Sequence, residues 1–190
     1  LDWYGEHRVV DSGVRRHLHM FMDEEYIYML YEIVDDIIYD HTPDTPINSY
    51  WNDDTIEIFV DEDRSGGDHA FANWAQAWAY HISTLGDVVD SINGNASVLD
   101  KHIELDIQHE GNVHTWEMRM RIYGPNYDPD KTNTPLKLYR GKIMGFTASY
   151  IDNDGGSQRE HMMGTVDTVG HQTNQGYLSS DDFGTLRLVD

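Results

Sequence analysis

The stretch Trp51–Asp61, WNDDTIEIFVD, decides the fold of this chain. Its apolar residues fall at every second position, which is the pattern of a β-strand, because successive side chains of a strand point to opposite faces. Three branched apolar residues are expected to face a core: Ile56, Ile58 and Val60. The opposite face is expected to carry Thr55, Glu57 and Phe59. The stretch therefore predicts a strand with a carboxylate on its outward face and a tryptophan at its mouth.

Short alternating runs recur along the rest of the chain and predict further strands. They cover residues 17–22, 26–34, 79–83, 103–108, 115–123, 143–151 and 185–189. Turn sequences such as Asn93-Gly94-Asn95 and Glu110-Gly111-Asn112 separate them. This spacing indicates a single all-β domain over residues 1–190, an antiparallel β-sandwich or jelly roll. Binding residues are expected on the long polar loops at 40–50, 124–138 and 164–182.

Two tryptophans in the segment FANWAQAWAY are four residues apart, which is helical spacing. The spacing of Trp74 and Trp78 predicts a short helix or a loop that covers the sheet. Alternatively, the two rings widen an aromatic platform. Trp116 and Glu117 lie within an expected strand, and we assign them structural roles.

The chain is strongly acidic, with 13 basic and 34 acidic residues and a formal net charge of −21. Nucleic acids and anionic membrane surfaces are bound through Lys and Arg, so neither is an expected partner. A neutral ligand meets no such repulsion, and divalent cations are attracted. The acidity also suits the solubility of a secreted or salt-adapted protein.

Cysteine is absent, which removes disulfides, thiolate zinc sites and thiol nucleophiles together. No apolar run approaches the roughly 20 residues that a membrane span requires, so membrane insertion is not expected. The chain begins at Leu1 rather than Met. This predicts either a trimmed targeting segment or a module of a longer protein.

A series of short motifs runs through the chain in a fixed order. It comprises DEEYIYM (23–29), VDD (34–36), WNDDTIEIFVD (51–61), AYHIS (79–83), TWEM (115–118), DND followed by RE (152–160) and FGTLRL (183–188). In order and spacing these motifs resemble the family 9 carbohydrate-binding modules. The resemblance spans roughly residues 15–189.

The resemblance implies a β-sandwich that holds a neutral sugar, often a chain-end unit, between two aromatic side chains. The first aromatic position corresponds to Trp51. The second lies six residues before the terminal Phe-Gly and corresponds to Tyr177, where the family often has Trp. The polar residues of the expected site are Glu57, His81, Arg159 and Asn174.

These residue types suit sugar binding on physical grounds. A flat ring can cover the apolar face of a pyranose, a contact worth on the order of 1 kcal/mol beyond the buried area. The hydroxyl rim requires fixed donors and acceptors, and charged ones bind more strongly. Structural interpretations also stand beside this one. Trp51 could pack at the strand entry, Tyr177 could pin a loop, and Glu57 could be solvated or paired with Arg159.

Two acidic turns are candidate calcium sites, because Ca²⁺ prefers carboxylate oxygens and the resemblance implies that relatives can carry structural calcium. Asp61 and Asp63 open the sequence DEDRSG, which matches the first half of an EF-hand loop, but position twelve is Ala72 instead of Glu. Asp152 and Asp154 open the sequence DNDG, whose glycine comes too early for that motif. Acidic turns without an ion are the alternative for both.

The resemblance implies non-catalytic carbohydrate binding by a module of a larger secreted protein. Such a protein would be extracellular, periplasmic or on the cell surface, and it would have an attached catalytic domain. Three alternatives stay open. A glycosidase needs two carboxyl groups about 5–10 Å apart, and no motif assigns them. A haem domain of this fold could use Met and His ligands, and a structural domain could retain the fold with a decayed sugar site.

Overall fold

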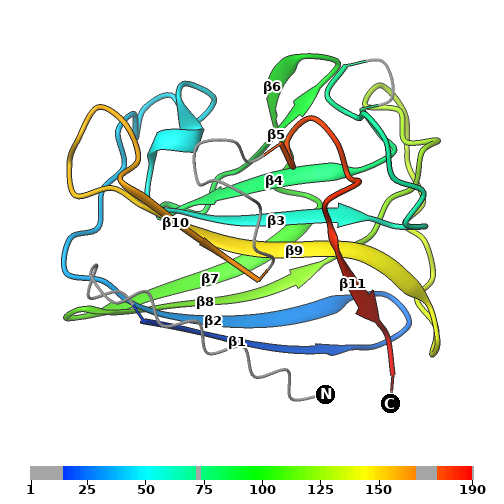
Figure 1. The fold of residues 1–190 in the computed structure, drawn as a ribbon, viewed down its shortest axis with the longest axis horizontal. Coiled ribbons are helices and arrows are strands. Elements are labelled where there is room, and N and C mark those ends of the chain that lie inside the picture. The colour runs from blue at the N-terminus through cyan, green and yellow to red at the C-terminus, as the bar shows by residue number, and fades with distance from the viewer. Residues whose placement is uncertain (1–14, 72–73, 166–174, 190) are drawn as a thin grey trace.

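The computed structural model describes residues 15–71, 74–165 and 175–189, which form two antiparallel sheets packed face to face (Figure 1). The smaller sheet has the order β1 (Arg15–Met22), β2 (Ile27–Val34), β8 (Val113–Met120) and β7 (Ile103–Glu110). The larger sheet has the order β10 (His161–Gly164), β9 (Ile143–Asp152), β3 (Thr55–Asp61), β4 (Trp78–Ser83), β5 (Val88–Ile92) and β6 (Asn95–Val98). In addition, β11 (Gly184–Arg187) pairs with β9, and a short 3₁₀ helix, η1 (Tyr50–Asn52), precedes β3. The predicted all-β antiparallel sandwich is confirmed.

The main core lies between the two sheets, and the alternation in WNDDTIEIFVD is what fills its centre. Ile56, Ile58 and Val60 are fully buried in this core, as predicted. The smaller sheet supplies the opposing side chains from every second position of two strands: Ile27, Met29, Tyr31 and Ile33 on β2, and Trp116, Met118 and Met120 on β8. Burial of this apolar surface stabilises the packing of the two sheets.

The opposite face of β3 is also buried, which corrects the expectation of an open outward face. Every residue of β3 is buried. Phe59 packs there with Ala77, Ala79 and Phe183 in a second apolar cluster. Phe183 comes from the segment just before β11, which is far from β3 in sequence. Alternation assigns a side chain to a face, but it cannot tell which distant segment covers that face.

All eight predicted runs contain a strand, and the described residues form three further strands that were not predicted: β5, β6 and β10. A two-residue turn joins β5 to β6, and both of its residues, Asn93 (φ 51°) and Gly94 (φ 77°), have positive φ. Two positive φ values are what a type I′ hairpin requires, and Asn-Gly is the sequence that favours it. The turn was therefore recognised, but the short strands beside it were not.

Of the two structures expected from the spacing of Trp74 and Trp78, a short helix or a loop that covers the sheet, the described residues form the loop and not the helix. Trp78 opens β4 and is buried in the main core, while Trp74 lies in the turn before it. The two rings meet edge to face, with their centroids 5.9 Å apart. Their spacing therefore reflects core packing at a strand entry and not a helix or an aromatic platform.

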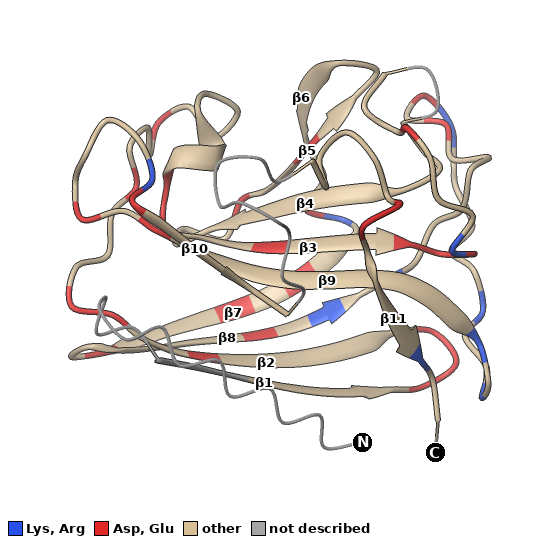
Figure 2. Cartoon of the chain, in the orientation of Figure 1, with Lys and Arg blue, Asp and Glu red and all other residues tan. Residues whose placement is uncertain are grey.

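Acidic residues are distributed over both sheets and many of the connecting loops (Figure 2). Among the residues that the structure describes, no helix is long and apolar enough to cross a membrane.

Candidate ligand-binding site

Trp51 stands at the entry of β3, where the sequence places it. It belongs to η1, and the residue before the helix, Ser49, has the left-handed φ of 55° that turns the chain there. The indole is 47% exposed and meets Tyr50 edge to face, with ring centroids 5.1 Å apart. A ring so exposed can still be covered by a ligand.

Glu57 is the centre of a buried polar network on the second face of the larger sheet. The register places His81 of β4 and Ser149 of β9 on either side of it. Its Oε1 lies 2.9 Å from Nε2 of His81, and its Oε2 accepts a hydrogen bond of 2.7 Å from Oγ of Ser149. The guanidinium of Arg159 lies 3.8 Å from Oε1. The sequence-based pairing of Glu57 with Arg159 is thus present, although the carboxylate is 1% exposed and not solvated.

The network sets the charge of Glu57. Burial by itself raises the pKa of a carboxyl group. The charge of His81, together with the hydrogen bonds from His81 and Ser149, outweighs this effect, and the pKa of Glu57 is lowered. Glu57 therefore stays ionised and holds the two basic residues in place.

His81 is held at both ring nitrogens. Its Nε2 faces the Glu57 carboxylate, and its Nδ1 lies 3.0 Å from the carbonyl oxygen of Ala79. Both partners are acceptors, so the geometry suits the protonated ring, in which both nitrogens donate. The ring also packs edge to face against Tyr50, with the ring centroids 4.7 Å apart.

Tyr50 and Asp90 join the site without having been predicted. Burial, followed by the charges of Asp90 and Glu57, raises the pKa of Tyr50 to about 12, so its hydroxyl stays neutral and can donate or accept. Asp90 is buried and accepts hydrogen bonds from the amides of Ala79 (2.8 Å) and Ser91 (2.6 Å). Tyr50 could have been found as the neighbour of Trp51. Asp90 could not, because only the β4–β5 pairing brings it near.

The loop that carries Arg159 is tied to η1. The amide of Arg159 donates to Oδ1 of Asn52 at 3.4 Å, and the side chain of Asn153 donates to the backbone oxygen of Asn52. Asp54 accepts the amides of Tyr39 and Asn153 at 2.5 and 2.6 Å. These bonds fix Arg159 and Trp51 relative to each other.

Tyr177 lies in the segment before β11 and is 53% exposed. A series of ring contacts runs from Trp51 towards it through Tyr50, His81, Phe59, Phe183 and His69. His69 hydrogen-bonds to the backbone beside Tyr177. The fourth predicted polar residue, Asn174, lies outside the described residues.

The four aspartates predicted for calcium separate into two places at opposite ends of the β3–β9 pair. One oxygen of Asp61 accepts from the Gly66 amide (2.9 Å) and from Oγ of Ser180 (3.0 Å). The other oxygen is buried and has no hydrogen-bond partner among the described residues. Asp63 accepts the Ser65 amide at 3.0 Å. These two aspartates shape the turn after β3.

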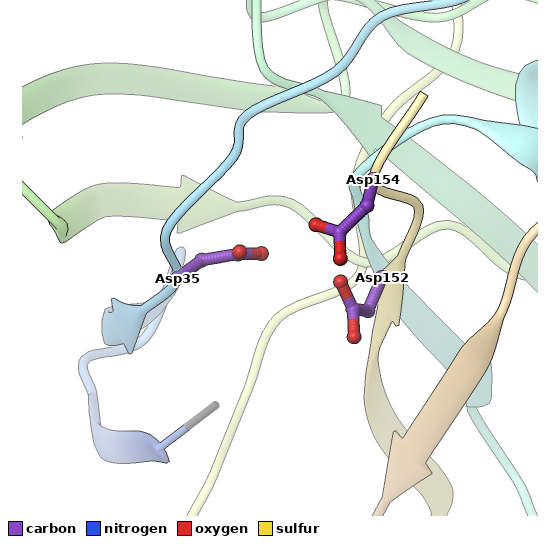
Figure 3. Close-up of side chains that lie close together, drawn as sticks. All are labelled: Asp35, Asp152 and Asp154. Carbon is purple, nitrogen blue, oxygen red and sulfur yellow. The ribbon is translucent and has the colours of Figure 1, made fainter. Parts of the chain in front are cut away.

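Asp152 and Asp154 come together with a third carboxylate that the sequence did not single out, Asp35 (Figure 3). One oxygen of each lies within 4.8 Å of the others. Burial, followed by the charges of Asp35 and Asp154, raises the pKa of Asp152 to about 6. Burial likewise raises the pKa of Asp35. Three crowded hard-oxygen donors suit Ca²⁺, and Asp35 was missed because it comes from the end of β2 in the other sheet.

The comparisons with known proteins agree with this architecture. The family described as "Carbohydrate family 9 binding domain-like" matches residues 6–190. A carbohydrate-binding module of family 9 from Caldicellulosiruptor kristjanssonii, solved with cellotriose, has a TM-score of 0.68 and 16% identity over 95% of this chain and 78% of its own. The same module with glucose gives 0.67 and 16%, over 95% and 79%.

A putative carbohydrate-binding protein from Bacteroides uniformis has a TM-score of 0.60 and 12% identity, over 92% of this chain and 78% of its own. No curated protein sequence matches. The fold likeness and the family match confirm the resemblance that the motifs indicated. The chain belongs to the carbohydrate family 9 binding domain-like family.

Proposed function

We propose that this domain binds a neutral sugar without acting on it, and that Trp51 and Tyr177 form the two walls of the site. The observation that carries the proposal is the exposed Trp51 ring, which Tyr50 connects to the ordered network of His81, Glu57 and Arg159. The family match and the structural relatives solved with cellotriose and glucose support the same ligand class.

The division of labour follows from the chemistry of a pyranose. Its apolar face would lie on the Trp51 indole, since flat rings cover apolar surface well. Its hydroxyl groups would meet the groups around the ring: the neutral Tyr50 hydroxyl and the guanidinium of Arg159, whose side chain is 27% exposed. Glu57 has both oxygens engaged, so its first role would be to orient His81 and Arg159. Direct contact of Glu57 with the sugar stays a prediction.

The ligand would be neutral and not anionic. The negative charges of Glu57 and Asp90 act on Tyr50 in the proposed site, and the chain as a whole has a formal charge of −21. A uronic acid would bring a further negative charge to this surface, which opposes binding. Neutral glucosides meet no such repulsion.

Calorimetric titration with glucose and cellotriose tests the proposal. We expect binding in the millimolar to micromolar range, about −4 to −8 kcal/mol. Trp51→Ala should weaken it at least about tenfold, because the ring supplies the apolar wall. Phe21→Ala is the matched control, since Phe21 is an exposed aromatic on the smaller sheet. Equal affinity of the wild-type protein and Trp51→Ala would remove Trp51 from the site.

The absence of catalysis is part of the proposal and has its own test. Sustained release of reducing sugar from polysaccharide by the purified chain would favour a glycosidase instead. A Soret band after haem addition would favour the haem alternative. We further propose that the domain serves a secreted carbohydrate-active protein with an attached catalytic domain, because its family is one of binding domains. The mass and location of the native protein test that setting.

We also propose that Asp35, Asp152 and Asp154 hold a structural calcium ion. The support is the convergence of three carboxylates within 4.8 Å, two of them buried, whose mutual repulsion a divalent cation would relieve. Bound calcium would supply positive charge between the end of β2 and the end of β9.

A further inference from the structure

We propose that His69 is the positioning residue of the second wall: it holds the backbone on both sides of Tyr177 and so sets where that ring stands. The inference rests on the proposed function, because it assumes that Tyr177 contacts the sugar. It adds a residue that neither the sequence motifs nor the site chemistry singled out.

The contacts of His69 bracket Tyr177. Nε2 of its ring lies 2.8 Å from the carbonyl oxygen of Gly176, the residue before Tyr177. Its backbone amide donates a 2.8 Å hydrogen bond to the carbonyl oxygen of Leu178, the residue after Tyr177. One residue therefore fixes both peptide neighbours of the proposed wall.

Other bonds hold residues 179–181, which lie farther along the chain from Tyr177. The amide of Ser180 donates to the carbonyl oxygen of Gly67 at 3.0 Å, and Asp68 bridges to Ser179. The amide of Gly67 donates to Oδ1 of Asp181 at 2.8 Å. The His69 side chain takes part in none of these bonds. The ring of His69 is the side chain that acts next to Tyr177 itself.

Burial makes His69 suited to this task. The residue is 4% exposed, and its ring packs edge to face against Phe183 with centroids 5.9 Å apart. A carbonyl oxygen can only accept, so Nε2 must carry the hydrogen. Desolvation lowers the pKa of His69, and this effect outweighs the hydrogen bond to Gly176 and the charges of Asp61 and Asp68, which raise it. The ring is therefore neutral at neutral pH. The Nε2–H is present in that neutral tautomer and in the protonated ring, so the bond survives titration.

Fixing this backbone matters because Tyr177 is half exposed. A side chain that stands in solvent is oriented mainly by its own backbone, and ordering it on binding would cost free energy. An anchor that is already in place before the ligand arrives reduces that cost. His69 would thus raise affinity without touching the sugar.

A double-mutant cycle tests the inference. His69→Phe keeps a ring against Phe183 but removes the donor, and we expect it to weaken sugar binding about tenfold, the effect of one ordinary hydrogen bond. In a Tyr177→Ala background the same substitution should change affinity less than about twofold, because its target is gone. His69→Gln, which can place an amide N–H near the Nε2 position, should recover most of the affinity. An equal loss in both backgrounds would overturn the inference.

Hydrogen exchange supplies a readout that needs no sugar. The amides of Leu178 and Ser179 donate to the carbonyl oxygen of Gln175 at 2.8 and 2.9 Å and report the order of this segment. We expect them to exchange about tenfold faster in His69→Phe and to be unchanged in His19→Phe, a control on the smaller sheet. Unchanged exchange in His69→Phe would also overturn the inference. Faster exchange in a protein that binds no sugar would instead refute only the proposed function.

Discussion

At the scale of single residues, Glu57 is the group that holds the polar network of the proposed site together. It was expected to stand on an open face, ready for a sugar hydroxyl. It is instead buried, with one oxygen toward His81 and Arg159 and the other toward Ser149. A buried charge is tolerable only when it is paired and hydrogen-bonded, so the residues around it are fixed as strictly as Glu57 itself.

Glu57→Gln should therefore destabilise the fold as well as weaken sugar binding. The amide cannot balance the charge of His81, and breaking a buried ion pair typically costs about 3–5 kcal/mol. Urea denaturation at neutral pH measures the loss. Glu104→Gln is the control, because Glu104 pairs with Arg119 and Arg121 at the surface, where an ion pair is worth about 1 kcal/mol or less. Similar losses in the two variants would contradict a special role for Glu57.

The same variant gives a pH signature. The pKa of Glu57 is lowered from the ordinary value of 4.5, so the folded state favours its ionised form. The stability that this provides is fully present above about pH 4.5 and is lost as the pH falls through the lowered folded-state pKa. The contribution of the Glu57 carboxylate to the difference in unfolding free energy between wild type and Glu57→Gln should therefore shrink as the pH falls below about 4.5. A difference that grew in acid would reverse this sign.

At the scale of elements, β3 organises the proposed site from one end to the other. Trp51 precedes it, Glu57 lies at its middle, and Asp61 at its end accepts a hydrogen bond from Ser180, in the segment that carries Tyr177. The strand and the direction of its side chains follow from alternation in the sequence alone. The burial of its second face does not follow from the alternation, because Phe183, which covers that face, lies near the other end of the chain.

The same reasoning explains the other gaps between sequence and structure. The sequence predicted only two of the three clustered carboxylates, Asp152 and Asp154, because Asp35 belongs to the other sheet. Ser149 reaches Glu57 only through strand pairing. The strands β5 and β6 flank a recognisable Asn-Gly turn, but they are short, and Asp90 and Ser91 break the apolar alternation. Local patterns predict faces and turns, whereas contacts between distant segments require the fold.

The β5–β6 turn offers a test of one such distant contact. Gly94 and Gly111 both have positive φ, 77° and 60°, so alanine should cost about 1 kcal/mol at either position. A Cβ at Gly94 would also lie 2.9 Å from the ring of Phe71, while a Cβ at Gly111 would meet nothing within 4 Å. Gly94→Ala should therefore be the more destabilising in urea, by roughly 0.5–1 kcal/mol. Phe71→Ala should remove the difference, and a difference that persists would exclude the contact as its cause.

At the scale of the whole molecule, the Asp35–Asp152–Asp154 cluster links the two halves of the sandwich. Asp35 follows β2 of the smaller sheet, and Asp152 ends β9 of the larger one. The hydroxyl of Tyr150 on β9 donates to Asp35 at 2.8 Å, so the sheets are already joined there. Three carboxylates at this junction repel one another, and that repulsion weakens the connection between the two sheets.

A calcium ion at this junction would turn the repulsion into a bond between the sheets and so raise global stability. At a concentration about 100 times its Kd, calcium should raise Tm by roughly 5–10 °C, and a chelator should reverse the change. Asp154→Asn should lose most of this response, whereas Asp106→Asn, an exposed aspartate on β7, should keep it. Magnesium should stabilise less, because it demands closer octahedral geometry. If Tm did not respond to calcium in the wild-type protein, the cluster would be an acidic junction without an ion, joined by the hydrogen bond from Tyr150 to Asp35.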